Sequence, residues 1–153
     1  MCRLLILLFP AFLFVSCARE WRGDGPPESL QESVWVGTNI ARHEVIEMCF
    51  GCSGEVSVSR HEDGSSVESG DVRLLFMHQD SAAVMDTVLY KGEYTYSRVP
   101  SSVSGDVYHG SVRMTLTEAV TGESANAKMS FYNMRFYLYF NDSYYPSDPA
   151  RNQ

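Results

Sequence analysis

Between residues 33 and 140, apolar and polar side chains alternate along short segments that are separated by turn-forming residues. Strict alternation of this kind is typical of a β-strand with one buried face. The pattern predicts about eight strands, which cover residues 34–38, 44–50, 55–60, 72–80, 83–90, 93–97, 107–117 and 127–140. No segment keeps the period of a helix beyond one turn. We therefore expect an all-β domain over 33–145, an antiparallel up-and-down β-barrel, since closure of the sheet leaves no exposed edge.

The alternation also predicts which side chains face the interior of the barrel. Val56 and Val58 are expected inward, and Gly92 is expected in a turn between two strands. One face of the final segment, 127–140, should point inward, with Phe131 on the opposite face. The carboxylates that flank predicted turns should face water. The inward set is Tyr94, Tyr96, Val112, Met114, Leu116, Tyr132, Met134, Phe136, Leu138 and Phe140, and the water-facing carboxylates are Glu62, Asp63, Glu68 and Asp71.

The first 16 residues have the parts of a secretory signal peptide. Arg3 is followed by an apolar run over 4–15, which is too short to span a bilayer core, and a small residue, Ser16, precedes Cys17. We expect 1–16 to be removed. Ordinary cleavage near this point would give a secreted product, whereas lipidation of Cys17 would anchor the mature chain to a membrane.

Residues 17–32 are rich in charge, glycine and proline and have no apolar period, which predicts a flexible tether. The tether contains Arg22-Gly23-Asp24, a tripeptide of some integrin ligands, although three common residues in a linker usually have no such role. Residues 146–153 are expected to be a C-terminal tail.

Cys49 and Cys52 remain once Cys2 and Cys17 are set aside. In an oxidising envelope they can form a small structural disulfide. Two free thiols, or redox or metal chemistry, are the alternatives. A thioredoxin-like site needs this spacing at the start of a helix, whereas here glycines and strand-like residues surround it.

Several motifs, taken in order, resemble lipocalin-like lipoproteins of Bacteroidetes. They are Ser16-Cys17, which is similar to a lipobox, then Trp35-Val36-Gly37-Thr38, Leu74-Leu75-Phe76 and Gly92-Glu93-Tyr94-Thr95-Tyr96. The resemblance implies acylation of Cys17 and a location in the cell envelope, anchored by lipid, at the outer membrane. In such proteins Asp-Ser/Thr-aliphatic tripeptides are O-glycosylated, which makes Ser81 and Thr87 candidate sites.

The aromatic residues are the main candidates for ligand contacts. In a barrel of this size, interior side chains either fill the space or leave room for one small ligand. The first hypothesis is a carrier of a small apolar, amphipathic or glycan ligand, and the second is a filled barrel that binds an envelope protein through exposed Tyr137, Tyr139, Tyr144 and Tyr145. The candidate ligand contacts are Trp35, Tyr94, Tyr96, Tyr108, Tyr132 and Phe136.

Other function classes have little support in the sequence. A net charge of −7 without a basic cluster disfavours nucleic-acid binding. No nucleophile elbow, phosphate-binding glycine loop or zinc helix motif occurs, so we expect no enzyme and no cofactor. His43, His61, His78 and His109 lie on separate predicted elements, and no metal site is expected.

Overall fold

The computed structural model describes residues 26–52, 54–79, 85–99, 109–132 and 135–147. Their regular elements are nine strands and one 3-10 turn, and they contain no helix with the length and hydropathy to cross a membrane. In order, the elements are β1 Ser33–Asn39, η1 Ile40–Arg42, β2 Glu44–Phe50, β3 Ser57–Arg60, β4 Ser66–Gln79, β5 Met85–Val99, β6 His109–Glu118, β7 Ser124–Tyr132, β8 Arg135–Phe140 and β9 Ser143–Ser147.

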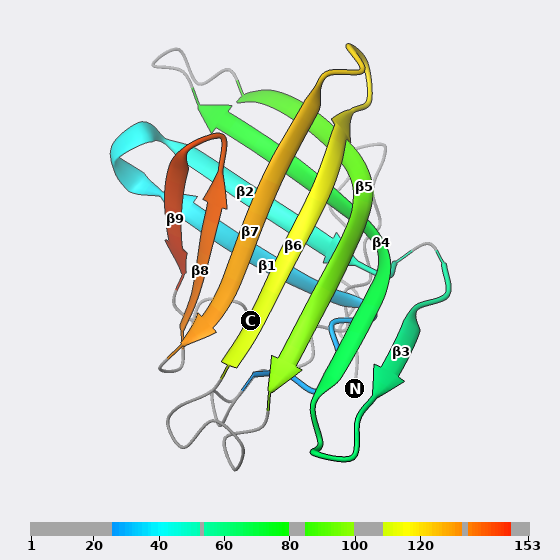
Figure 1. The fold of residues 1–153 in the computed structure, drawn as a ribbon. Helices are drawn as coiled ribbons and strands as arrows, with labels where there is room; N and C mark the ends of the chain where they lie inside the picture. Colours follow the sequence, from blue (N-terminus) through cyan, green and yellow to red (C-terminus); the bar gives the residue numbers. More distant parts are fainter. Residues whose placement is uncertain (1–25, 53, 80–84, 100–108, 133–134, 148–153) are drawn as a thin grey trace, which may run out of the picture.

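The strands form one antiparallel sheet that curls into an up-and-down barrel (Figure 1). Its hydrogen-bonded order is β1-β2-β4-β5-β6-β7-β8-β9, and β3 pairs with β4 beside this path. The two ends of the order, β1 and β9, lie next to each other, and a Cβ atom at Gly37 would lie 3.2 Å from the Tyr145 Cβ. The predicted all-β antiparallel barrel is confirmed.

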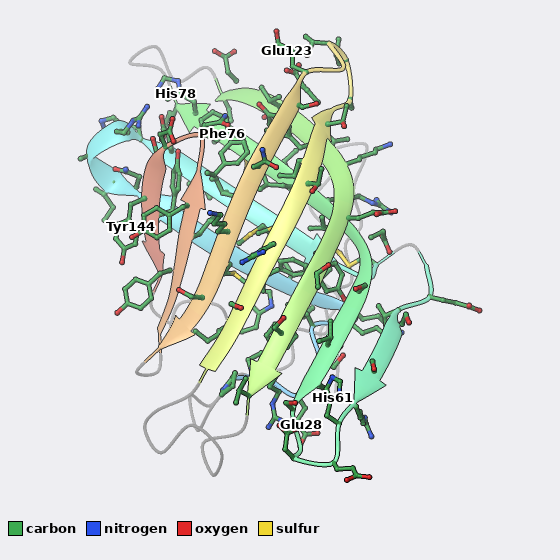
Figure 2. All side chains as sticks on the ribbon, viewed as in Figure 1. Glu28, His61, Phe76, His78, Glu123 and Tyr144 are labelled. Carbon is green, nitrogen blue, oxygen red and sulfur yellow. A yellow bond between two sulfur atoms is a disulfide. The ribbon has the colours of Figure 1, made fainter. Side chains whose placement is uncertain are left out.

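The barrel has two ends with different coverings. At one end residues 26–30, which we call the strap, lie beside the first residues of β1 and β4 and the last residues of β5. At the far end are the β1–β2 and β6–β7 connections, with Glu123 in the latter (Figure 2). The sequence predicts a flexible tether that extends to residue 32, and this is wrong for the strap, because Leu30 is 0% exposed. The two prolines and the lack of an apolar period in this segment gave no sign that Leu30 would be buried.

The turn expected at Gly92 is wrong, because Gly92 lies inside β5. The strand runs without interruption from Met85 to Val99 and pairs with both β4 and β6 throughout its middle. A Cβ atom at position 92 would lie 1.9 Å from the Thr115 carbonyl oxygen. Gly92 therefore allows a close approach of two backbones inside the sheet and does not reverse the chain.

The final segment also differs from the prediction. Residues 127–140 are not one strand but parts of β7 and β8, which pair antiparallel with Phe131 opposite Phe136. A hairpin changes the phase of the alternation, so Phe131 is buried, although it was expected outward. Leu138 and Phe140 are buried as predicted, and Met134 lies outside the described residues.

β3 is a short strand on the outside of the barrel. All four of its residues are exposed, including Val58 at 44%, which was expected inward. Val56, just before the strand, does pack against the core. With only four residues, which pair with the first part of β4, β3 is too short to run the length of the barrel wall.

Candidate functional site

Near the centre of the barrel, four inward side chains are completely covered by other parts of the protein. Ile46 on β2, Leu74 on β4, Leu116 on β6 and Leu138 on β8 are each 0% exposed. A side chain that lined a cavity of water size or larger would expose area to that cavity, and these expose none. These four side chains are therefore packed as in a protein core.

Three of the predicted ligand contacts lie together near the strap. The Trp35 ring is 5.1 Å from Phe131, the Tyr96 ring is 5.9 Å from Phe131, and the Tyr94 ring is 5.0 Å from Phe50. All three contacts are edge-to-face, the arrangement that the ring quadrupoles favour. Trp35 and Tyr96 thus share Phe131 as a neighbour, Tyr94 packs on Phe50, and all five residues belong to the core.

The hydroxyls of the two interior tyrosines already have partners in the protein. The Tyr94 hydroxyl donates to Glu68 Oε1 at 2.6 Å, and the Tyr96 hydroxyl donates to the Pro27 carbonyl oxygen at 2.6 Å. Burial raises the pKa of both tyrosines, and for Tyr94 the hydrogen bond to Glu68 adds to the rise. A ligand head group is therefore not needed to satisfy these hydroxyls.

Glu68 is a buried carboxylate whose position differs from the prediction. It was expected to face water beside a turn, but it is 1% exposed within β4. Its Oε1 also accepts from the Leu30 backbone N–H at 3.0 Å, and Oε2 has no hydrogen-bond partner among the described residues. Because one oxygen joins strap and barrel wall, Glu68 positions the strap. The alternation in 66–72 places Glu68 and Val72 on the same face, which is the signal that could have revealed it.

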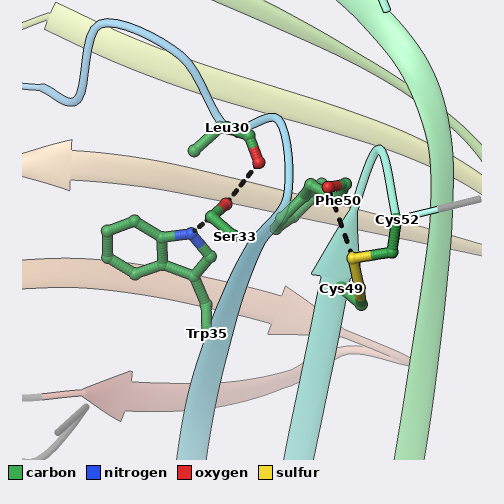
Figure 3. The surroundings of a disulfide bond; sticks show 6 residues. All are labelled: Leu30, Ser33, Trp35, Cys49, Phe50 and Cys52. Atoms are coloured by element: carbon green, nitrogen blue, oxygen red, sulfur yellow. Dashed lines mark hydrogen bonds between the residues drawn. A yellow bond between two sulfur atoms is a disulfide. The ribbon is translucent and has the colours of Figure 1, made fainter. Parts of the chain in front are cut away.

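The two cysteines lie on either side of Phe50, the residue that packs against Tyr94. Figure 3 shows Cys49, at the end of β2, joined to Cys52 by a disulfide. Cys52 Sγ lies 3.5 Å from the Phe50 carbonyl oxygen, and Cys52 itself is exposed. The tight connection after β2 is thus cross-linked next to the strap, where Ser33 donates to the Leu30 carbonyl oxygen and accepts from Trp35 Nε1.

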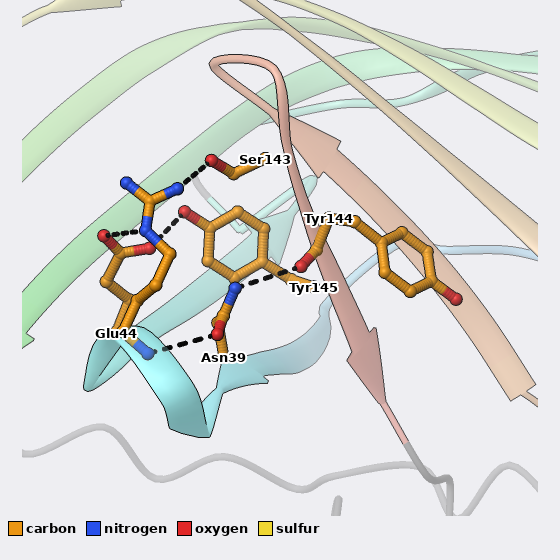
Figure 4. A network of polar contacts seen from close by, with 6 residues as sticks. Asn39, Glu44, Ser143, Tyr144 and Tyr145 are labelled. Carbon is orange, nitrogen blue, oxygen red and sulfur yellow. Dashed lines mark hydrogen bonds and ion pairs between the residues drawn. The ribbon is translucent and has the colours of Figure 1, made fainter.

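A second buried carboxylate, at the far end, joins β2 to the edge strand β9. Figure 4 shows Glu44, 5% exposed, accepting at Oε2 from the Tyr145 hydroxyl at 2.7 Å. Arg42 pairs with Glu44 through Nε at 3.2 Å and donates to Ser143 Oγ. Asn39 Nδ2 donates to the Tyr144 carbonyl oxygen at 3.4 Å. These contacts connect β9 to the β1–β2 hairpin across the two ends of the nearly closed sheet.

Tyr145 therefore belongs to the core and not to the exposed group in which it was predicted. It is 2% exposed, and burial together with the Glu44 hydrogen bond raises its pKa to about 12. The other three members of the predicted group do lie together on the outer wall of β8 and β9. The rings of Tyr137 and Tyr144 are stacked at 5.8 Å, and those of Tyr139 and Tyr144 are 5.1 Å apart. Tyr139 is 53% exposed.

The far end has a third aromatic group. Phe76 and Tyr90 are half-buried, and their rings lie 6.0 Å and 5.2 Å from that of Phe140. Burial, with a smaller contribution from the negative charge of Glu118, raises the pKa of Tyr90. This is the one part of the described interior wall where aromatic side chains reach solvent.

Several predicted site residues cannot be placed in this arrangement. Cys17, Ser81 and Tyr108 lie outside the described residues, and for Tyr132 and Phe136 only the backbone is described. Thr87 is exposed on β5. Within the described ranges no group of three or more histidine, cysteine, aspartate or glutamate side chains is arranged to hold a metal ion.

Comparison of the chain with known protein families, with curated proteins and with solved structures found no match.

Proposed function

We propose that this is a non-enzymatic protein of the bacterial cell envelope, anchored by lipid on Cys17, that binds its partner on the outer wall of a filled barrel. The observation that supports this most directly is the absence of exposed area on inward side chains such as Ile46 and Leu116. A carrier barrel would need free volume in their place.

The anchor would determine how the barrel is presented. Residues 17–25 separate Cys17 from the strap, and a fully extended chain of that length reaches at most roughly 30 Å. The strap end would therefore stay near the membrane. The outer walls of β6 to β9 would be displayed to the side, where Tyr137, Tyr139 and Tyr144 are accessible.

The anchor is tested by Cys17→Ala in the native host. We expect the wild-type protein in the membrane fraction, with an acylated N-terminal peptide in its mass spectrum. The variant should appear in the soluble fraction or the medium, since acyl chains provide the membrane affinity. A mature protein without acyl mass would contradict the proposal.

The outer-wall interaction is tested by photocrosslinking in intact host cells. p-Benzoylphenylalanine is placed at position 139, on the outer wall, or at position 120, where Val120 is 91% exposed in the β6–β7 connection. We expect a discrete adduct from position 139 and none from position 120. Equal labelling from both positions, or no adduct from position 139, would contradict a specific outer-wall partner.

A second candidate function is binding of a small amphipathic molecule at the far end, which the half-buried Phe76 and Tyr90 favour. Native mass spectrometry of protein purified from its own host tests it directly. A retained small molecule that is lost in Tyr90→Ala would favour this function, whereas an unliganded mass would favour the filled barrel.

A further inference from the structure

The outer wall of β5 to β9 contains a row of side chains that strand register places side by side. Thr95 pairs with Arg113, Arg113 with Lys128, Lys128 with Tyr139, and Tyr139 with Tyr144. Thr95, Arg113, Lys128 and Tyr139 are exposed, and Tyr144 is half-buried. With adjacent strands about 4.8 Å apart, the part of the row from Arg113 to Tyr144 extends roughly 14 Å.

Two like charges directly opposite each other are unfavourable in a sheet. Arg113 and Lys128 occupy such a pair, and within the described residues neither has an ion-pair partner. The register places Ser111, Thr115 and Tyr137, all uncharged, diagonal to Lys128, and Glu93 is the acidic residue diagonal to Arg113. Glu93 offsets only part of the charge of the two cations, so in a chain of net charge −7 this pair remains a local site of positive charge that an anion would neutralise.

The composition of the wall indicates what kind of anion it would bind. Protein–protein interfaces are depleted in lysine and serine and concentrate apolar residues at their centre. Here, apart from Glu93, the exposed strand residues directly around the two cations have hydroxyl or amide groups and none is aliphatic: Thr95, Ser111, Thr115, Asn126 and Ser130. Short polar side chains suit a ligand rich in hydroxyl groups.

We propose that this row binds a carbohydrate chain that carries carboxylate or sulfate groups. Arg113 and Lys128 pair with the acidic groups, and Tyr139, next in the row, offers its ring face to the apolar side of a sugar ring. The Tyr144 ring packs against the Tyr139 ring, with ring centroids 5.1 Å apart. The inference rests on the outer-wall function proposed above and names the ligand class.

The test measures binding of the full-length, detergent-solubilised protein to four polymers: dextran sulfate, polygalacturonate, neutral dextran and polyglutamate. We expect binding to the first two and none to neutral dextran. Arg113→Gln/Lys128→Gln should weaken binding by at least about tenfold, because hydrogen bonds to charged groups are lost. Arg60→Gln/Lys91→Gln, which removes the same charge from exposed positions on β3 and β5, is the matched control and should have little effect.

Tyr139→Ala separates carbohydrate binding from simple charge attraction. It should weaken binding to the two acidic polysaccharides and leave any binding of polyglutamate unchanged. Equal affinity for polyglutamate with no effect of Tyr139→Ala would overturn the proposal in favour of an acidic protein partner. So would an absence of binding to either acidic polysaccharide. If the position-139 adduct persists in cells despite such a result, the outer-wall function stands and only the ligand class is wrong.

Discussion

The protein has two groups of tyrosines that differ in what surrounds their hydroxyls. Tyr94, Tyr96 and Tyr145 are at most 2% exposed, and each hydroxyl donates to a protein oxygen. On the outer wall, the Tyr144 ring stacks on that of Tyr137 and is tilted against that of Tyr139. Aromatic content alone would assign either group to a ligand site.

The difference shows how a core tyrosine can be distinguished from a binding tyrosine. A buried hydroxyl must find a partner, and here Glu68, Glu44 and the strap provide one inside the protein. A tyrosine that is exposed on a sheet face next to unpaired cations has no such structural need. The interior group therefore stabilises the barrel, and the outer group is available for binding.

The largest effect is expected from Tyr96→Ala. Deleting a large buried aromatic side chain costs about 3–5 kcal/mol of unfolding free energy, and the strap also loses the hydrogen bond at Pro27. Urea denaturation followed by circular dichroism measures this loss. A change below about 1 kcal/mol would mean that Tyr96 does not belong to the packed core.

Leu30→Ala tests whether the strap is part of the folded domain. Leu30 is 0% exposed, so the substitution should cost about 2–5 kcal/mol. The neighbouring Gln31→Ala is the control, since Gln31 is exposed. If both variants are as stable as the wild type, the strap is a tether after all.

Tyr94→Phe removes only a hydroxyl and leaves Glu68 Oε1 with one donor fewer. We expect a loss of about 1–3 kcal/mol, because a buried carboxylate whose Oε2 has no partner loses one of its two donors and keeps only the Leu30 N–H. Tyr139→Phe is the matched substitution on the outer wall and should stay within about 0.5 kcal/mol. Equal losses at the two positions would remove the distinction between the groups.

Alkaline pH should weaken the fold through the interior group. The pKa of Tyr145 is raised from 10.0 to about 12, so the unfolded chain releases this proton at lower pH than the folded one. Stability is complete below pH 10 and falls as the pH rises toward 12. Denaturation series at several pH values measure the slope, and Tyr145→Phe should make it shallower. A slope unchanged by that substitution would contradict the assignment.

The smallest effect on stability is expected from Tyr139→Ala, within about 0.5 kcal/mol, because the side chain is half exposed. Thermal unfolding measures it. A loss of several kcal/mol would show that the outer group is structural like the inner one.

The sequence by itself determined the fold class. Alternation is a local property, so β2, β6 and the inward positions of Tyr94 and Tyr96 could be predicted from short segments. The turn before Ser66 was likewise predicted from an Asp-Gly pair, because hairpin connections depend on a few adjacent residues.

Only the tertiary structure decided which polar and aromatic side chains are buried and which lie side by side on the outer wall. Glu68 is buried because the strap, 38 residues earlier in the chain, covers it. The hairpin between β7 and β8 determined the face of Phe131, and the register of three strands, β6, β7 and β8, brought Arg113, Lys128 and Tyr139 into one row. These outcomes depend on pairing between distant segments, and a shift of register by one residue would reverse every face.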